Sequence, residues 1–99
     1  MQGRAETIET LQRNADAIKA LGATALYLFG SVAEGKQRPD SDVDLFFDPT
    51  PDADLSLFEF VGIKNRLTDT LGVEADLHLR EGLNKHIRRN AEAEAVRVF

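Results

Sequence analysis

Residues 30–45 read GSVAEGKQRPDSDVDL, and this stretch decides the fold that the sequence predicts. It begins directly after a short apolar run, residues 25–29 (ALYLF), which is typical of a buried strand. It ends inside a second predicted strand, Asp42 to Phe47, which opens with two carboxylates. The intervening Lys36 to Ser41 is polar and contains Pro39, which predicts a loop between the two strands.

Asp42 and Asp44 are two positions apart in the second predicted strand. Because successive strand side chains alternate between faces, both carboxylates point to one face, about 6.5–7 Å apart. Two like charges held side by side repel, and a small dication relieves that repulsion. Mg²⁺ typically binds through one or two carboxylates plus substrate phosphates. Two such ions, about 3.5–4 Å apart, can hold the attacking and leaving oxygens of an in-line displacement.

Gly30 and Ser31 lie where the first predicted strand ends and a short helix over residues 32–34 is expected. Glycine allows the backbone to come close to a ligand, and a helix start presents free N–H donors that suit a phosphate. The Ser31 hydroxyl adds a further donor. A phosphate site and a metal site are therefore expected in one short stretch, although Asp-x-Asp alone also fits a solvated strand face and Gly-Ser alone fits a turn.

A third carboxylate is expected from residues 73–79, which alternate between apolar and polar side chains like a half-buried strand. Asp76 lies on the polar face and is the leading candidate, while Glu74 and His78 share that face as fallback candidates. A solvated position and a metal ligand are equally compatible with Asp76 taken by itself.

The rest of the chain predicts helices around these strands. Apolar residues recur at helical spacing over residues 8–21, with Gly22 as the stop, and a helix from Ser56 or Asp54 runs to about Thr70 before Gly72. Leu83, Ile87, Ala91, Ala95 and Val98 mark a last helix. The order α-β-(short α)-β-α-β-α predicts an α/β fold, and we expect residues 1–99 to form a single domain.

Composition excludes several classes of function. The chain has 12 basic and 17 acidic residues and a net charge of −5, which disfavours direct binding of nucleic acid. It has no Cys, so neither disulfides nor thiolate metal sites are possible. No apolar run approaches the ~20 residues of a membrane span, and Met1 to Thr10 does not resemble a secretory signal. We therefore expect a cytoplasmic protein without a membrane partner.

The motif resembles the signature of the polymerase-β-type nucleotidyltransferase superfamily, in which Gly-Ser precedes Asp-x-Asp at this separation. The closest resemblance is to the minimal nucleotidyltransferases, which are commonly paired with HEPN-domain proteins as the antitoxin of a toxin–antitoxin system. The resemblance extends to the Ala75-Asp76-Leu77 strand and to the closing residues 94–98 (EAVRV). In one departure, Glu34 stands where family members often carry Arg.

The resemblance implies a polymerase-β-like fold, with a three-stranded mixed sheet in order 1-2-3 and helices packed on it. It implies that Asp42 and Asp44 bind two Mg²⁺ ions and that Asp76 binds the ion that activates the acceptor. Gly30 and Ser31 would hold the triphosphate of ATP, with Lys36 and Arg38 as further cofactor-binding residues. The implied reaction is transfer of AMP from ATP to a tyrosine of a HEPN-domain toxin, which neutralises the toxin.

Other functions remain open on the sequence alone. A binding module could keep this fold and neutralise a partner by covering it, with catalysis weak or absent. Transfer to a small molecule such as an aminoglycoside is a third possibility. His86, Arg88 and Arg89 lie on a helix that is polar away from its apolar stripe, and we interpret them as surface residues or partner contacts.

Overall fold

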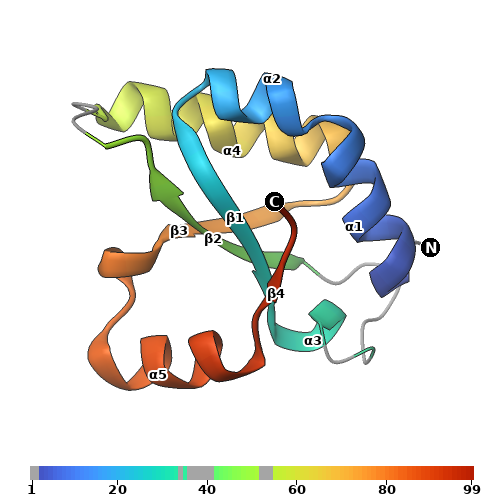
Figure 1. Cartoon of the computed structure of the whole chain (residues 1–99), viewed down its shortest axis with the longest axis vertical. Helices are drawn as coiled ribbons and strands as arrows, with labels where there is room; N and C mark the ends of the chain where they lie inside the picture. The colour runs from blue at the N-terminus through green and yellow to red at the C-terminus, as the bar shows by residue number, and fades with distance from the viewer. Residues whose placement is uncertain (1–2, 34, 36–41, 52–54) are drawn as a thin grey trace.

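The structure is a computed structural model that describes residues 3–33, 35, 42–51 and 55–99 (Figure 1). Helices cover a mixed sheet on both faces, with α1, α2 and α4 on one side and α5 on the other. The elements in chain order are α1 (Arg4–Arg13), α2 (Ala15–Ala20), β1 (Ala23–Phe29), α3 (Gly30–Ala33), β2 (Val43–Pro49), α4 (Leu57–Leu71), β3 (Ala75–Leu79), the 3-10 turn η1 (Arg80–Gly82), α5 (Lys85–Glu94) and β4 (Val96–Arg97).

The sheet has four strands in the order β3-β2-β1-β4. β1 runs antiparallel to both β2 and β4, whereas β2 and β3 are parallel. The predicted order 1-2-3 is confirmed for the first three strands, but the expectation of only three strands is wrong. Residues 96–97, which we assigned to the last helix, instead form an edge strand beside β1.

The last helix ends at Glu94 because Ala95 takes up an extended backbone conformation (φ −63°, ψ 142°). Val98 continues the helical spacing of apolar residues, so periodicity alone extends the helix too far. Its burial is provided by the sheet: Val98 is 3% exposed, and its N–H donates to the carbonyl of Leu26 in β1. β-branched residues such as Val96 and Val98 also suit a pleated strand.

The helix predicted over residues 8–21 is interrupted at Asn14, which separates α1 from α2. The Asn14 side chain donates to the carbonyl of Thr10, and its backbone (φ −104°, ψ 11°) leaves the helical region. Asparagine competes in this way with helical hydrogen bonding.

Both ends of α4 agree with the prediction from the sequence. The Ser56 side chain caps the start by accepting a hydrogen bond from the N–H of Glu59, and Gly72 ends the helix in the left-handed conformation.

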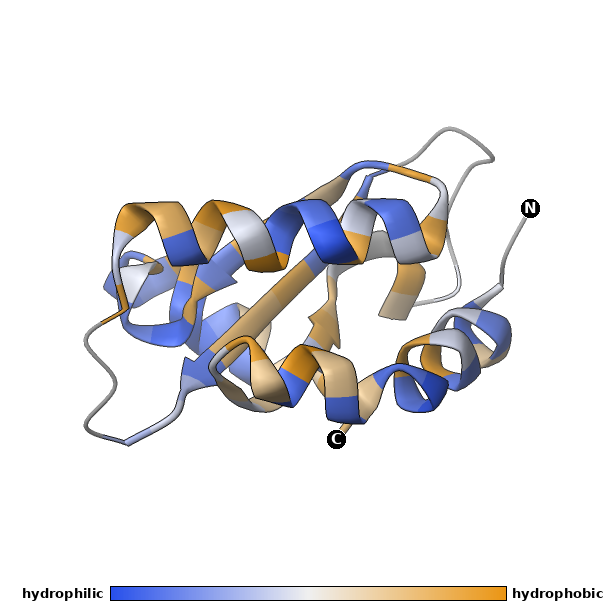
Figure 2. Cartoon of the chain, turned by 90° about the horizontal axis from the view of Figure 1, so that it is seen from above, coloured by the Kyte–Doolittle hydropathy of each residue, from blue (hydrophilic) through white to orange (hydrophobic). Residues whose placement is uncertain are grey.

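Two apolar layers lie on opposite faces of the sheet. The larger layer packs β1, β2 and β3 against α1, α2 and α4, and its fully buried members include Leu26, Leu45 and Phe47. Seen from above in Figure 2, the central strand that passes beneath these helices is coloured mainly as hydrophobic. The smaller layer places Phe46 beneath Ala91 of α5. Among the described residues, no helix is both long and apolar enough to cross a membrane.

Candidate active site

Asp44 and Asp76 occupy paired positions on neighbouring strands. β2 and β3 run parallel, with Val43 opposite Ala75, Asp44 opposite Asp76, and Leu45 opposite Leu77. Val43, Leu45, Ala75 and Leu77 belong to the larger apolar layer, so strand alternation directs the two aspartates to the opposite face, which α5 covers in part. The structure thus brings together two of the three predicted carboxylates on one face of the sheet.

The environment of Asp44 opposes its ionisation. The pKa of Asp44 is raised from 3.8 to about 6, mainly because the carboxyl group is partly buried. Asp76 contributes twice: it accepts a hydrogen bond from protonated Asp44, and its negative charge opposes ionisation of Asp44. Asp42 adds to this rise, whereas His78 opposes it. Asp42 is therefore near enough to act on Asp44, although its own side chain is exposed. Among the described residues, burial and the acidic neighbours of Asp44 therefore outweigh the opposing effect of His78.

Gly30 comes into direct contact with Asp44. Its backbone lies in the left-handed region (φ +74°), and a Cβ atom built on it would overlap the Asp44 carboxylate and lie 3.1 Å from Asp44 Cβ. Only glycine satisfies both conditions without strain. The antiparallel pairing of Phe29 with Asp44 produces this approach, because the residue after β1 follows directly beside the start of β2. Gly30, the first residue of α3, thus packs directly against the carboxylate of Asp44.

The two fallback candidates have different surroundings. His78 Nε2 lies 3.2 Å from Asp76 Oδ1, and the His78 ring is 6.3 Å from the ring of Phe29. His78 therefore belongs to the carboxylate site. Glu74 precedes β3 and pairs with Lys64 of α4 at 3.1 Å, which commits its carboxylate to a structural ion pair.

Several predicted site residues lie outside the part that is described. Lys36 and Arg38, the predicted cofactor-binding residues, fall in the range 36–41, and Glu34 is likewise outside the described residues. The backbone of Ser31 lies in α3, one position after Gly30, but its side chain is also outside the description. Their proposed roles therefore remain predictions.

Arg80 is a structural residue that we did not identify from the sequence. Its guanidinium donates from Nε and Nη2 to both carboxylate oxygens of Asp48, at 2.8 and 3.0 Å, and from Nη1 to Glu92 at 2.8 Å. The same group lies 4.7 Å from the ring of Tyr27 and 5.1 Å from that of Phe46. Arg80 thereby ties β2 to α5. Its partners are 32 and 12 residues away, and no local pattern signals such contacts.

The chemistry of this arrangement suits a hard cation held together with phosphate. Within residues 3–33, 35, 42–51 and 55–99, no three acidic or histidine side chains form a complete metal-binding group. Mg²⁺ does not require one, because it usually binds through one or two carboxylates, water and substrate phosphates. Asp44 and Asp76 supply such a pair, on adjacent positions of β2 and β3.

Comparison with known proteins agrees with this geometry. Residues 9–98 match the family model described as a nucleotidyltransferase domain. The protein adenylyltransferase MntA of Thermococcus cleftensis is 32% identical over 79 residues, covering 78% of this chain and 76% of MntA. A solved structure described as a candidate minimal nucleotidyltransferase is 32% identical, covers 90% of this chain and 93% of its own, and has a TM-score of 0.71.

A second solved structure, a toxin–antitoxin crystallised with AMP-PNP, shares the fold at 16% identity. Its TM-score is 0.72, and the match covers 89% of this chain and 72% of that one. The chain therefore belongs to the nucleotidyltransferase domain family, and within it to the minimal nucleotidyltransferases related to the protein adenylyltransferase MntA.

Proposed function

We propose that this protein transfers the adenylyl group of ATP to a tyrosine hydroxyl of a HEPN-domain toxin and so acts as its antitoxin. The observation that carries the proposal is the in-register pair of Asp44 and Asp76 beside Gly30. The relationship to MntA, named as a protein adenylyltransferase, supports transfer to a protein. The structural likeness to a toxin–antitoxin that contains an ATP analogue supports ATP as the donor.

Asp44 and Asp76 are the residues that we propose to hold Mg²⁺, with Asp42 as a further ligand. The fit rests on their oxygen donors and on the raised pKa of Asp44, which reflects burial and the neighbouring negative charge of Asp76. When bound, the metal would neutralise the pyrophosphate leaving group and lower the pKa of the acceptor hydroxyl. The role of the chain is to fix these carboxylates on adjacent strands before the substrates arrive.

Gly30 and the residues that follow it form the proposed ATP side of the site. The missing Cβ at Gly30 permits close approach next to Asp44, and we assign phosphate contacts to Ser31, Lys36 and Arg38. In the reaction, the acceptor oxygen forms a bond to the α-phosphorus of ATP while the bond to pyrophosphate breaks. Such a transfer depends mainly on positioning and charge stabilisation, which a small domain can supply.

Asp76 forms the proposed acceptor side of the site. Its side chain is about half exposed, and its oxygen Oδ1 is oriented by His78. An exposed carboxylate at this position is accessible to a hydroxyl from a docked protein. Acceptor recognition is therefore assigned to the surface around the sheet face that carries Asp76.

Mass spectrometry tests the proposal. A HEPN-domain protein, the proposed partner, is incubated with this protein, ATP and Mg²⁺, and its intact mass and modified residue are determined. We expect adenylyl additions at a tyrosine with wild type, none with Asp44→Asn or Asp76→Asn, and normal transfer with Asp69→Asn, which changes an exposed carboxylate on α4. If wild type neutralises the toxin without a mass shift, and Asp44→Asn does so equally well, the protein acts by binding alone.

A further inference from the structure

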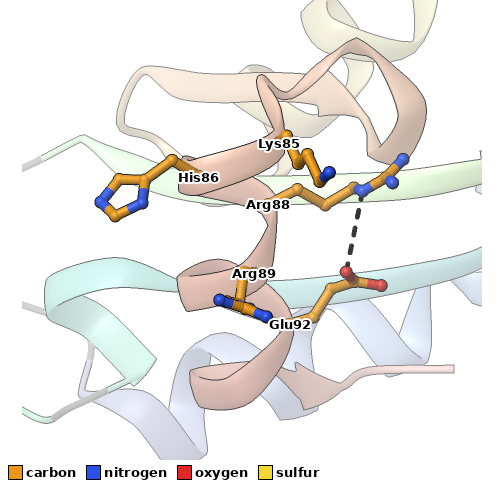
Figure 3. Close-up of a pocket in the computed structure, with 5 residues that line it drawn as sticks. All are labelled: Lys85, His86, Arg88, Arg89 and Glu92. Carbon is orange, nitrogen blue, oxygen red and sulfur yellow. Dashed lines mark ion pairs between the residues drawn. The ribbon is translucent and has the colours of Figure 1, made fainter.

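The surface of α5 is rich in positive charge, although the chain as a whole carries −5. Lys85, His86, Arg88 and Arg89 line an open hollow of about 600 Å³, together with Glu92 (Figure 3). Lys85 and Arg88 extend from one side of the helix and His86 from the other. Arg88 approaches Glu92 only loosely, at 3.8 Å. We call Lys85, Arg88 and Arg89, with His86 beside them, the cationic surface of α5, and it remains available to a partner.

The helix that carries this surface is held firmly. Asn84 caps its first turn by accepting from the N–H of Ile87, and Ala91 is buried against Phe46 of the sheet. On the same helix, Glu92 accepts from Arg80, whose guanidinium is also bound to Asp48 of β2. The backbone of α5 is thus ordered before a partner binds, which lowers the entropic cost of binding.

The helix that carries the cationic surface packs beside the carboxylate site. α5 packs on the sheet face that carries Asp44 and Asp76, above Phe46, which is two positions beyond Asp44 on β2. α5 also contacts α3, the element that begins at Gly30 (Figure 1). A molecule that rests on α5 is consequently placed at the edge of the site that holds the carboxylates.

We propose that the cationic surface of α5 docks an acidic surface of the protein acceptor and so delivers its hydroxyl to the site, an inference that rests on the proposed function. The net charge of −5 and the carboxylate cluster repel an acidic partner, so among the described residues the cations gathered on α5 favour its approach there. Ile87, on the apolar stripe of the same helix, is 48% exposed and adds apolar contact beside the cations. A nucleic acid fits the cationic surface less well than an acidic protein does. Its phosphate backbone would extend beyond the ten-residue helix α5 and meet the negative charge of the rest of the chain.

Association kinetics test the inference. The double variant Lys85→Glu/Arg89→Glu reverses two exposed charges on α5, and Arg13→Glu/Arg66→Glu makes the same change in net charge on α1 and α4, across the sheet. Binding to the HEPN-domain protein is followed by stopped flow at low and high salt. We expect the α5 variant to associate about tenfold more slowly at low salt and the control variant less than about twofold, since local complementarity governs steering. The difference should shrink as salt screens it.

Each contrary result has a distinct meaning. Equal slowing in both double variants would show that only net charge matters, and would overturn the docking surface. An unchanged association rate combined with weaker binding of AMP-PNP would assign the α5 cations to nucleotide phosphates instead. Binding of single-stranded RNA that is lost in the α5 variant, with protein association unchanged, would also overturn the inference.

Adenylyl transfer by the wild-type protein is measured separately, at saturating partner. If the α5 variant slows association but wild type transfers nothing, the docking surface stands and the proposed reaction fails. If transfer occurs and the α5 variant associates normally, the reaction stands and the docking surface fails.

Discussion

Asp44 and Asp76 are direct register partners across two parallel strands, so their carboxylates are brought together by the backbone pairing of β2 with β3. The residues on either side of each aspartate are buried in the opposite layer. A slip of one residue would place the aspartates among those apolar side chains, and register is therefore strongly specified here. The geometry of the carboxylate pair thus depends on the packing of the opposite face of the sheet.

Replacing Gly30 should damage both the carboxylate site and the stability of the fold. Gly30 and Gly72 have almost the same φ, +74° and +73°, but a Cβ at Gly30 would meet atoms of Asp44 within 4 Å, whereas a Cβ at Gly72 would meet none. Gly72→Ala should therefore cost only the left-handed strain, about 1–2 kcal/mol. Gly30→Ala should lose roughly 1–3 kcal/mol more from overpacking, and it should abolish adenylyl transfer. Chemical denaturation and the transfer assay measure both effects, and equal losses at the two glycines would contradict the close contact with Asp44.

The stability of the metal-free protein should fall as pH rises from about 4 to just above the raised pKa of Asp44. Because burial and Asp76 raise that pKa from 3.8 to about 6, the folded state holds the proton more tightly than the unfolded state. The resulting stabilisation is present at low pH and is lost as pH rises through this window. In EDTA, Asp44→Asn should therefore gain melting temperature relative to wild type between pH 4 and about pH 6.5.

The control for this pH series is Asp69→Asn, an exposed carboxylate on α4. Its melting curve should follow that of wild type across the same range. A difference between wild type and Asp44→Asn that does not change with pH would contradict the raised pKa, and a large loss of stability in Asp44→Asn would assign Asp44 a structural hydrogen bond.

Arg80 should not tolerate replacement by lysine. Its planar guanidinium binds Asp48 through two parallel hydrogen bonds, reaches Glu92 and lies against Tyr27. Lysine keeps the charge but cannot form this fork or stack in the same way. Arg80→Lys should reduce the free energy of unfolding by roughly 1.5–3 kcal/mol, the range for hydrogen bonds to charged groups. Urea denaturation measures the loss, and the matched control is Arg88→Lys, because Arg88 forms a long ion pair of 3.8 Å with Glu92 on α5. Equal, small losses in both variants would show that the Arg80 contacts do not stabilise the fold.

The sequence was informative where its signal is local. Alternation over residues 73–79 placed Asp76 on the polar face of a strand, and the spacing of Asp42 and Asp44 placed both on one face. The family resemblance, confirmed by the match over residues 9–98, supplied the strand order that joins them. The edge strand β4 escaped prediction because Val98 fits helical spacing as well as strand alternation.

Local sequence patterns could not predict the contacts between residues far apart in the chain. The approach of Gly30 to Asp44 depends on the antiparallel pairing of β1 with β2. The contact of His78 with Asp76 could be inferred only as a shared strand face, and the contacts of Arg80 depend on where η1 and α5 lie relative to β2. The break at Asn14 likewise depends on a side-chain hydrogen bond that competes with the helix.

The most direct test of the central claim is transfer of label from ATP that carries radioactive phosphorus at either the α or the γ position. With Mg²⁺ and the HEPN-domain protein, label from α-labelled ATP should appear on that protein, whereas γ-labelled ATP should give none. Asp44→Asn should lose the α signal, and Asp69→Asn should keep it. Label transferred from the γ position, or an undiminished α signal with Asp44→Asn, would contradict adenylyl transfer at the carboxylate pair formed by Asp44 and Asp76.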